Sequence, residues 1–123
     1  MKIPAFLLRR LYVKGSLKGT PEGLEFQLSN RLGSGYAHRL LPLTVDGEEL
    51  DMKRTNFEVD GKSHTFAEVS KETTFTLGMN KTTVIRANSA PLTSGPHKLF
   101  MRFEVAGLGE RGFDFTDVVE NGA

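Results

Sequence analysis

Apolar and polar side chains alternate along several short segments of this chain, which limits the folds that it can adopt. In residues 98–105, every second side chain is apolar, namely Leu99, Met101, Phe103 and Val105. A repeat of two residues is typical of a strand with one buried face and one exposed face. Residues 91–97 come directly before this segment and are rich in proline, serine and glycine, which predicts a turn.

The same pattern recurs along the whole chain. Strands are expected over residues 11–17 with an interruption at Gly15, and over 24–28, 41–45, 57–59, 64–66, 75–77, 82–87 and 113–116. Residues 67–74 are expected to form a helical turn or a loop, and residues 107–112 a flexible connection. Residues 1–123 are therefore predicted to form a single all-β domain, an antiparallel two-sheet β-sandwich of about eight strands.

Two dipeptides and the inward-facing positions add detail to this prediction. Asp46-Gly47 and Asp60-Gly61 each follow a valine, and Asp-Gly tolerates the positive φ angles of tight hairpin turns, so each predicts a reversal of the chain. The expected core consists of the apolar side chains on the inward faces: Leu24, Phe26, Leu28, Leu43, Val45, Ile85, Met101, Phe103, Phe113 and Phe115.

Composition and charge exclude several classes of function. The formal net charge is +1, which gives no reason to expect nucleic acid or an acidic membrane surface as a partner. No apolar run approaches the ~18 residues of a membrane span. The chain has no cysteine, which excludes disulfides and thiolate chemistry and fits a reducing compartment. The opening apolar run is too short for a secretory signal, so a cytoplasmic location is expected.

The residues themselves indicate no catalytic, cofactor or metal site. His38, His64 and His97 are far apart in the sequence, and no pair has metal-ligand spacing. The carboxylates are scattered, and no serine lies in a nucleophile elbow. Neither a dinucleotide fingerprint nor a Walker loop is present.

The N-terminal segment is the exception to this unremarkable chemistry. Residues 4–8 are apolar at both odd and even positions, which a strand with one wet face does not need. One interpretation is that the segment covers the core of its own domain, and the other is that it docks on another protein. In the second case the candidate interface residues are Phe6, Leu8, Arg9, Arg10 and Tyr12.

Four stretches read together resemble the β subunit of bacterial C-glycoside deglycosidases: residues 3–17, 23–30, 43–47 and 91–97. The resemblance implies a small β-sandwich subunit in a hetero-oligomer with a TIM-barrel catalytic α subunit that holds a divalent metal, Mn or Mg. The complex would cleave the carbon–carbon bond between a 3-keto sugar and an aromatic aglycone, with the 3-keto C-glycoside bound mainly by the α subunit. This chain would then have no cofactor and no activity alone.

Two alternatives stay open from the sequence. A free-standing carbohydrate-binding module would stack exposed aromatic rings on sugars, but the chain has no tryptophan, and only Tyr12 and Tyr36 are available as tyrosines. A structural or adhesion sandwich is the second alternative, and it is disfavoured because the sequence shows no export signal.

Overall fold

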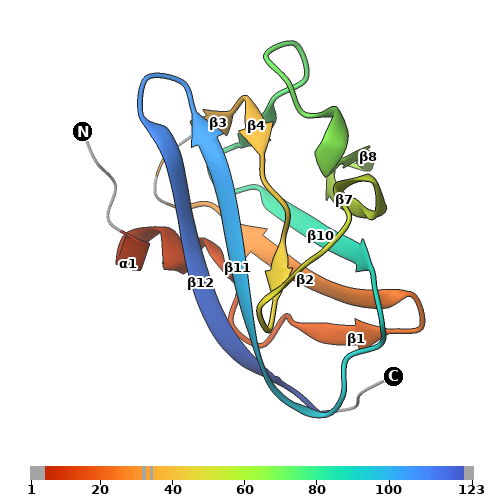
Figure 1. Ribbon diagram of the computed structural model, residues 1–123. Coiled ribbons are helices and arrows are strands. Elements are labelled where there is room, and N and C mark those ends of the chain that lie inside the picture. Colours follow the sequence, from red (N-terminus) through yellow and green to blue (C-terminus); the bar gives the residue numbers. More distant parts are fainter. Residues whose placement is uncertain (1–4, 32, 34, 121–123) are drawn as a thin grey trace.

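The computed structural model describes residues 5–31, 33 and 35–120. Within them the chain is mostly antiparallel strand, with two larger sheets packed face to face and a third, two-stranded sheet at one end (Figure 1). The strands of the two larger sheets cross one another in the view of Figure 1, as in sandwiches that pack their sheets at a large angle. The predicted all-β, sandwich-like fold is confirmed.

The first sheet is antiparallel throughout and is centred on β10. Its order is β1 (Lys18–Thr20), β2 (Gly23–Ser29), β10 (Thr82–Asn88), β7 (Thr55–Val59) and β8 (Lys62–Thr65). In this sheet Ile85 lies between Phe26 on one neighbour and Phe57 on the other, and all three side chains are buried. The alternation in the sequence therefore places one face of the sheet in the core.

The second sheet is built on a long hairpin. It contains β12 (Gly109–Val119), β11 (Gly95–Val105), β5 (Thr44–Val45) and β6 (Glu48–Glu49), with β4 (Arg39–Leu40) also paired to β11. The hairpin pairs over its full length, from Gly95 opposite Val119 to Val105 opposite Gly109.

The predicted flexible connection over residues 107–112 is wrong, because β12 already begins at Gly109. Its glycines resemble a loop in the sequence, but Gly112 serves strand packing. A Cβ there would lie 2.7 Å from the carbonyl oxygen of Met101 and 3.0 Å from the ring of Phe100. Because Gly112 has no Cβ, the backbone of β11 and the ring of Phe100 can pack closely against β12.

The remaining elements are short. The third sheet pairs β3 (Gly35–Ala37) with β9 (Phe75–Leu77). One helical turn, α1 (Ala5–Leu8), continues into the 3-10 turn η1 (Arg9–Leu11), and both pack against β12. Two further 3-10 turns are η2 (Met52–Arg54) and η3 (Phe66–Glu68).

The expected core is confirmed, because every side chain predicted for it is buried. Phe26 from the first sheet meets Phe115 from the second edge to face, with ring centroids 5.3 Å apart. The two expected Asp-Gly reversals are also confirmed: φ is 51° at Asp46 and 88° at Gly47, in the turn between β5 and β6. Asp60 and Gly61 adopt similar angles between β7 and β8.

The strand expected over residues 11–17 is wrong. Leu11 ends a 3-10 turn, Tyr12 makes a single bridge to Leu28, and β1 begins only at Lys18. The cause is a contact distant in sequence: the N–H of Gly15 donates to Asp117 of β12 at 2.8 Å, so the chain turns toward the second sheet.

Candidate binding site

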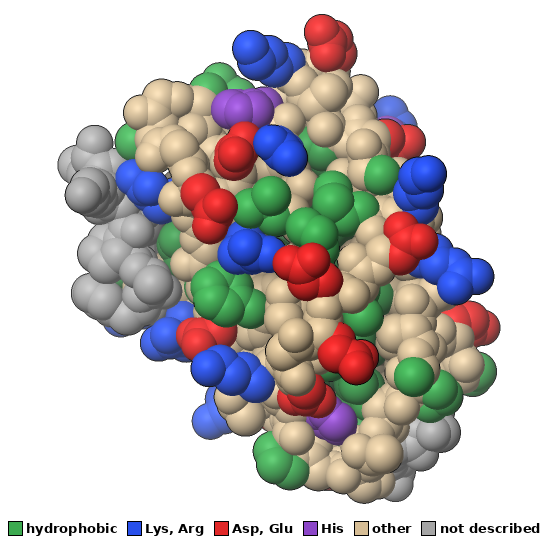
Figure 2. Space-filling model, in the orientation of Figure 1, with side chains coloured by type: hydrophobic (Ala, Val, Ile, Leu, Met, Phe, Trp, Pro, Cys, Tyr) green, Lys and Arg blue, Asp and Glu red, His purple; other side chains and the backbone are tan. Residues whose placement is uncertain are grey.

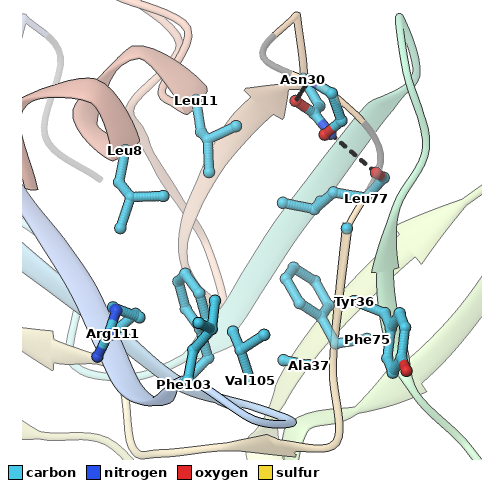
Figure 3. A pocket seen from close by; sticks show the side chains of 13 residues that line it. Leu8, Leu11, Asn30, Tyr36, Ala37, Phe75, Leu77, Phe103, Val105 and Arg111 are labelled. Atoms are coloured by element: carbon cyan, nitrogen blue, oxygen red, sulfur yellow. Dashed lines mark hydrogen bonds between the residues drawn. The ribbon is translucent and has the colours of Figure 1, made fainter. Parts of the chain in front are cut away.

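An open apolar pocket of about 130 Å³ lies at the end of the sandwich where the N-terminal segment, the β3–β9 pair and the β11–β12 hairpin meet (Figure 3). Its first wall is formed by α1 and η1, which contribute Leu8 and Leu11. A spacing of three residues in helical backbone puts both side chains on the same face. Figure 3 shows them pointing from the helical turns into the pocket.

The second wall is the short β3–β9 pair. Ala37 and Phe75 are partners in its register, and Leu77 lies two residues further along β9. The buried side-chain amide of Asn30 braces this wall. Its nitrogen donates to the carbonyl oxygens of Gly33 at 2.7 Å and Leu77 at 2.8 Å, so Asn30 shapes the pocket (Figure 3).

The third wall is the end of the β11–β12 hairpin. Phe103 lies directly opposite Arg111 in the register, and both line the pocket together with Val105. Arg111 is half-buried, and its Nη1 donates to the carbonyl oxygen of Glu110 at 2.7 Å. The pocket is thus an apolar cavity with a cation at its edge.

The predicted interface residues lie in different environments in the structure. Phe6 lies in α1, and its side chain is outside what the structure describes. Leu8 lines the pocket, whereas Arg10 is exposed. The Arg9 guanidinium donates to the Asp114 carboxylate at 2.8 Å and to its carbonyl oxygen at 2.7 Å, and the first contact lowers the pKa of Asp114. That the predicted interface residues contact a partner protein stays a prediction.

Tyr12, the last of these residues, is half-buried within its own domain. Its ring stacks on Phe115 with centroids 3.7 Å apart, and its hydroxyl donates to Asp117 at 2.6 Å. The same hydroxyl accepts from the N–H of Leu17. Burial, and then the hydrogen bond to Asp117, raise the pKa of Tyr12 to about 12. Tyr12 therefore anchors the N-terminal segment that forms the first wall of the pocket.

The three histidines each contact a different carboxylate. His64 pairs with Glu68, His38 approaches Glu104, and His97 pairs with Asp46. Among the residues that the structure describes, no three His, Cys, Asp or Glu side chains form a group that could hold a metal ion.

The His97–Asp46 pair is the best-defined of these contacts. His97 is 8% exposed; its Nδ1 lies 2.6 Å from Asp46 and its Nε2 lies 2.7 Å from the carbonyl oxygen of Thr93. Both neighbours are acceptors, so the protonated ring satisfies both contacts. Asp46, and then Thr93, raise the pKa of His97 above its ordinary 6.5. The hydrogen bond from His97, and then the N–H of Lys98, lower the pKa of Asp46.

We expect this pair to make stability depend on pH. Because the pKa of His97 is higher in the folded state, its contact stabilises the fold at a pH below the unfolded-state pKa, and this stability is lost as the pH rises through the folded-state pKa. Because the pKa of Asp46 is lower in the folded state, its contact stabilises the fold at a pH above the unfolded-state pKa, and this stability is lost as the pH falls through the folded-state pKa. The urea midpoint should therefore be lower at about pH 8 than at about pH 5.5. His97→Gln should remove most of this difference, and His64→Gln should keep it. If the His97→Gln variant keeps the whole pH difference in its urea midpoint, another group causes that difference.

The outer face of the second sheet is charged and balanced. Arg9 and Lys98 both pair with Asp114, at 2.8 and 3.4 Å. Arg102 pairs with Glu49 at 3.2 Å. Figure 2 shows basic and acidic side chains interspersed over this side of the molecule. A shallow groove here is lined by Arg9 and Lys98, but both cations already share Asp114, so the apolar pocket is the stronger candidate site.

Fold and pocket together define a small all-β domain with an open apolar pocket. A family model described as the hydroxymethylglutaryl-CoA reductase N-terminal domain matches residues 7–120. The chain therefore belongs to this family. No curated protein matches its sequence. In the described part of the chain, no helix is long and apolar enough to cross a membrane.

The family match corrects the expected function. It covers nearly the whole chain and names a family other than the C-glycoside deglycosidase β subunits, so that resemblance, and the lyase activity implied by it, are wrong. The stretches that suggested it include Asp46-Gly47, whose role in the structure is to close a hairpin. Such turn chemistry recurs in unrelated β-proteins.

The carbohydrate-binding alternative also lacks support. One of the two tyrosines available for stacking on a sugar, Tyr12, stacks on Phe115 instead. Tyr36 alone of the two is exposed, at 55%.

One residue of the pocket, Arg111, was missed from the sequence. Arg111 lay in a segment interpreted as a loop, and no local pattern paired it with Phe103. The segment of residues 4–8 did carry a signal, because its apolar character at both parities indicates that it covers something.

Proposed function

We propose that this chain is a non-catalytic domain that serves a hydroxymethylglutaryl-CoA reductase by binding an apolar ligand in its pocket. The observation that carries the proposal is the open pocket of about 130 Å³ bounded by three separate parts of the chain. An enclosed apolar cavity of roughly 150 Å³ lined by Leu, Ile and Phe binds benzene, and this pocket has similar walls but opens to solvent on one side. The family match supplies the reductase as the context.

In this proposal a separate catalytic protein or domain carries out the reduction, and this chain has no cofactor and no activity alone. The two associate through the N-terminal segment, where exposed Arg10 adjoins the apolar turn of α1. A cytoplasmic location belongs to the same proposal and is supported by the cysteine-free composition. The near-neutral net charge favours a protein partner over nucleic acid.

The test is an NMR titration of the isolated chain with 1-hexanol, a neutral probe whose alkyl body suits the pocket. We expect the amide signals of Ala37, Leu77 and Val105 to shift, with an affinity in about the millimolar range. Because Ala37 is buried at the pocket wall, Ala37→Leu should fill the space and weaken binding about tenfold or more.

Two further variants make the result decisive. Leu108→Phe fills the pocket from its rim and serves as a second blocking change if Ala37→Leu perturbs the fold. Thr82→Leu adds comparable bulk at an exposed position of β10 and should bind hexanol like the wild type. The proposal is contradicted if hexanol shifts none of the pocket signals, or if both blocking variants bind it as well as the wild type does.

A further inference from the structure

The edge of the pocket holds a cation that the apolar walls do not explain. Arg111 is half-buried, and no ion pair joins it to a carboxylate in residues 5–31, 33 and 35–120. Arg102, which is also half-buried, pairs with Glu49. Arg111 already donates to the carbonyl oxygen of Glu110, but even partial removal of a cation from water without an anionic partner is unfavourable. A bound anion would therefore find a favourable position at Arg111.

The body of the pocket sets the second requirement. Its walls are formed by Leu8, Phe75, Phe103 and similar side chains, and the Asn30 amide already donates to two carbonyl oxygens. A hydroxyl placed among these walls would lose its hydrogen bonds to water, which costs about 1–3 kcal/mol by mutational measures. The site therefore favours a ligand with an apolar body and one anionic end.

We propose that the pocket binds a short monocarboxylic acid, with its alkyl chain between Leu8, Phe75 and Phe103 and its carboxylate at Arg111. The inference rests on the proposed function, since it names the ligand class of the same pocket. A guanidinium suits a carboxylate because its fork of N–H donors matches the two oxygens. The volume of about 130 Å³ suits a body of about six carbons.

The geometry in Figure 3 is consistent with this arrangement. Arg111 projects from β12 beside Phe103, whereas Tyr36 and Phe75 lie on the opposite side of the pocket. A chain that enters between these walls leaves its head group on the side of Arg111. Hydroxymethylglutarate carries a hydroxyl and a second carboxylate, so it is expected to bind this apolar pocket more weakly than hexanoate.

The test compares hexanoate with 1-hexanol at neutral pH, by NMR titration of the wild type, Arg111→Met and Arg111→Lys. Wild type should bind hexanoate about tenfold more tightly than hexanol, because a hydrogen bond to a charged group contributes more than a neutral one. Arg111→Met keeps the length of the side chain and should abolish this preference, with the hexanol affinity of the same variant as the internal reference for any change in the pocket wall. Arg111→Lys should keep part of the preference.

Arg54→Met is the matched control, since Arg54 is exposed and lies in η2, outside the residues that line the pocket. It should retain the full preference for hexanoate. Equal binding of hexanoate and hexanol, or a preference that survives Arg111→Met, would overturn the inference and leave the proposed function standing. Absence of binding by both probes would overturn the two together.

Discussion

Phe26→Ala is expected to lower the free energy of unfolding by about 3–5 kcal/mol. Phe26 is 0% exposed and lies at the centre of the interface between the sheets. Its ring contacts Tyr12 at a centroid distance of 6.1 Å and Phe115 at 5.3 Å, both edge to face. Truncation leaves a cavity bordered by two sheets whose backbones are held by their ladders, so the site cannot collapse fully.

The matched control for this variant is Phe100→Ala. Phe100 lies on the outer face of β11 and is 40% exposed, so its loss should cost less than about 1 kcal/mol. Urea denaturation followed by circular dichroism measures both variants. If Phe26→Ala loses as little stability as Phe100→Ala, the two sheets do not pack through Phe26.

Gly23→Ala is expected to cost about 3 kcal/mol or more. At Gly23, φ is +152°, and an added Cβ would lie 2.2 Å from the carbonyl oxygen of Ala87 and 2.6 Å from the backbone nitrogen of Ser89. Both obstacles are main-chain atoms of or just beyond β10, the strand at the centre of the first sheet, so neither can rotate aside. The substitution forces β2 and β10 apart where their ladder ends.

Gly47→Ala separates this clash from ordinary backbone strain. Gly47 has φ of +88°, but its added Cβ would meet nothing within 4 Å. The cost there is the conformational one alone, about 1–2 kcal/mol. The measurement is the urea midpoint of the two variants side by side. If both substitutions lower the stability equally, the backbone of β10 does not lie as close to Gly23 as the structure shows.

Local patterns in the sequence were sufficient for much of the fold. The alternation around Phe103 and around Phe26 predicts which faces are buried because the side-chain period of a strand is fixed by its backbone. Asp60-Gly61 predicts a turn because that turn needs positive φ at two successive residues. These features depend on residues that are neighbours in the chain.

The parts that escaped prediction depend on residues far apart in the chain. The path of residues 12–17 follows from the bond between Gly15 and Asp117, which are separated by 102 positions. The pocket exists because Leu8, Leu77 and Arg111 converge from three distant segments. The family was also beyond reach of short motifs, since hairpin turns and alternating strands are shared by many β-proteins.

Whether the pocket binds an apolar ligand is tested directly by an isotope-filtered NOE experiment on the labelled chain with unlabelled 1-hexanol. If the pocket binds the alcohol, NOEs are expected from its terminal methyl group to the methyl groups of Leu8, Leu77 and Val105, which line the pocket from three sides. NOEs confined to exposed groups such as Val118, or none at all, would contradict binding in the pocket.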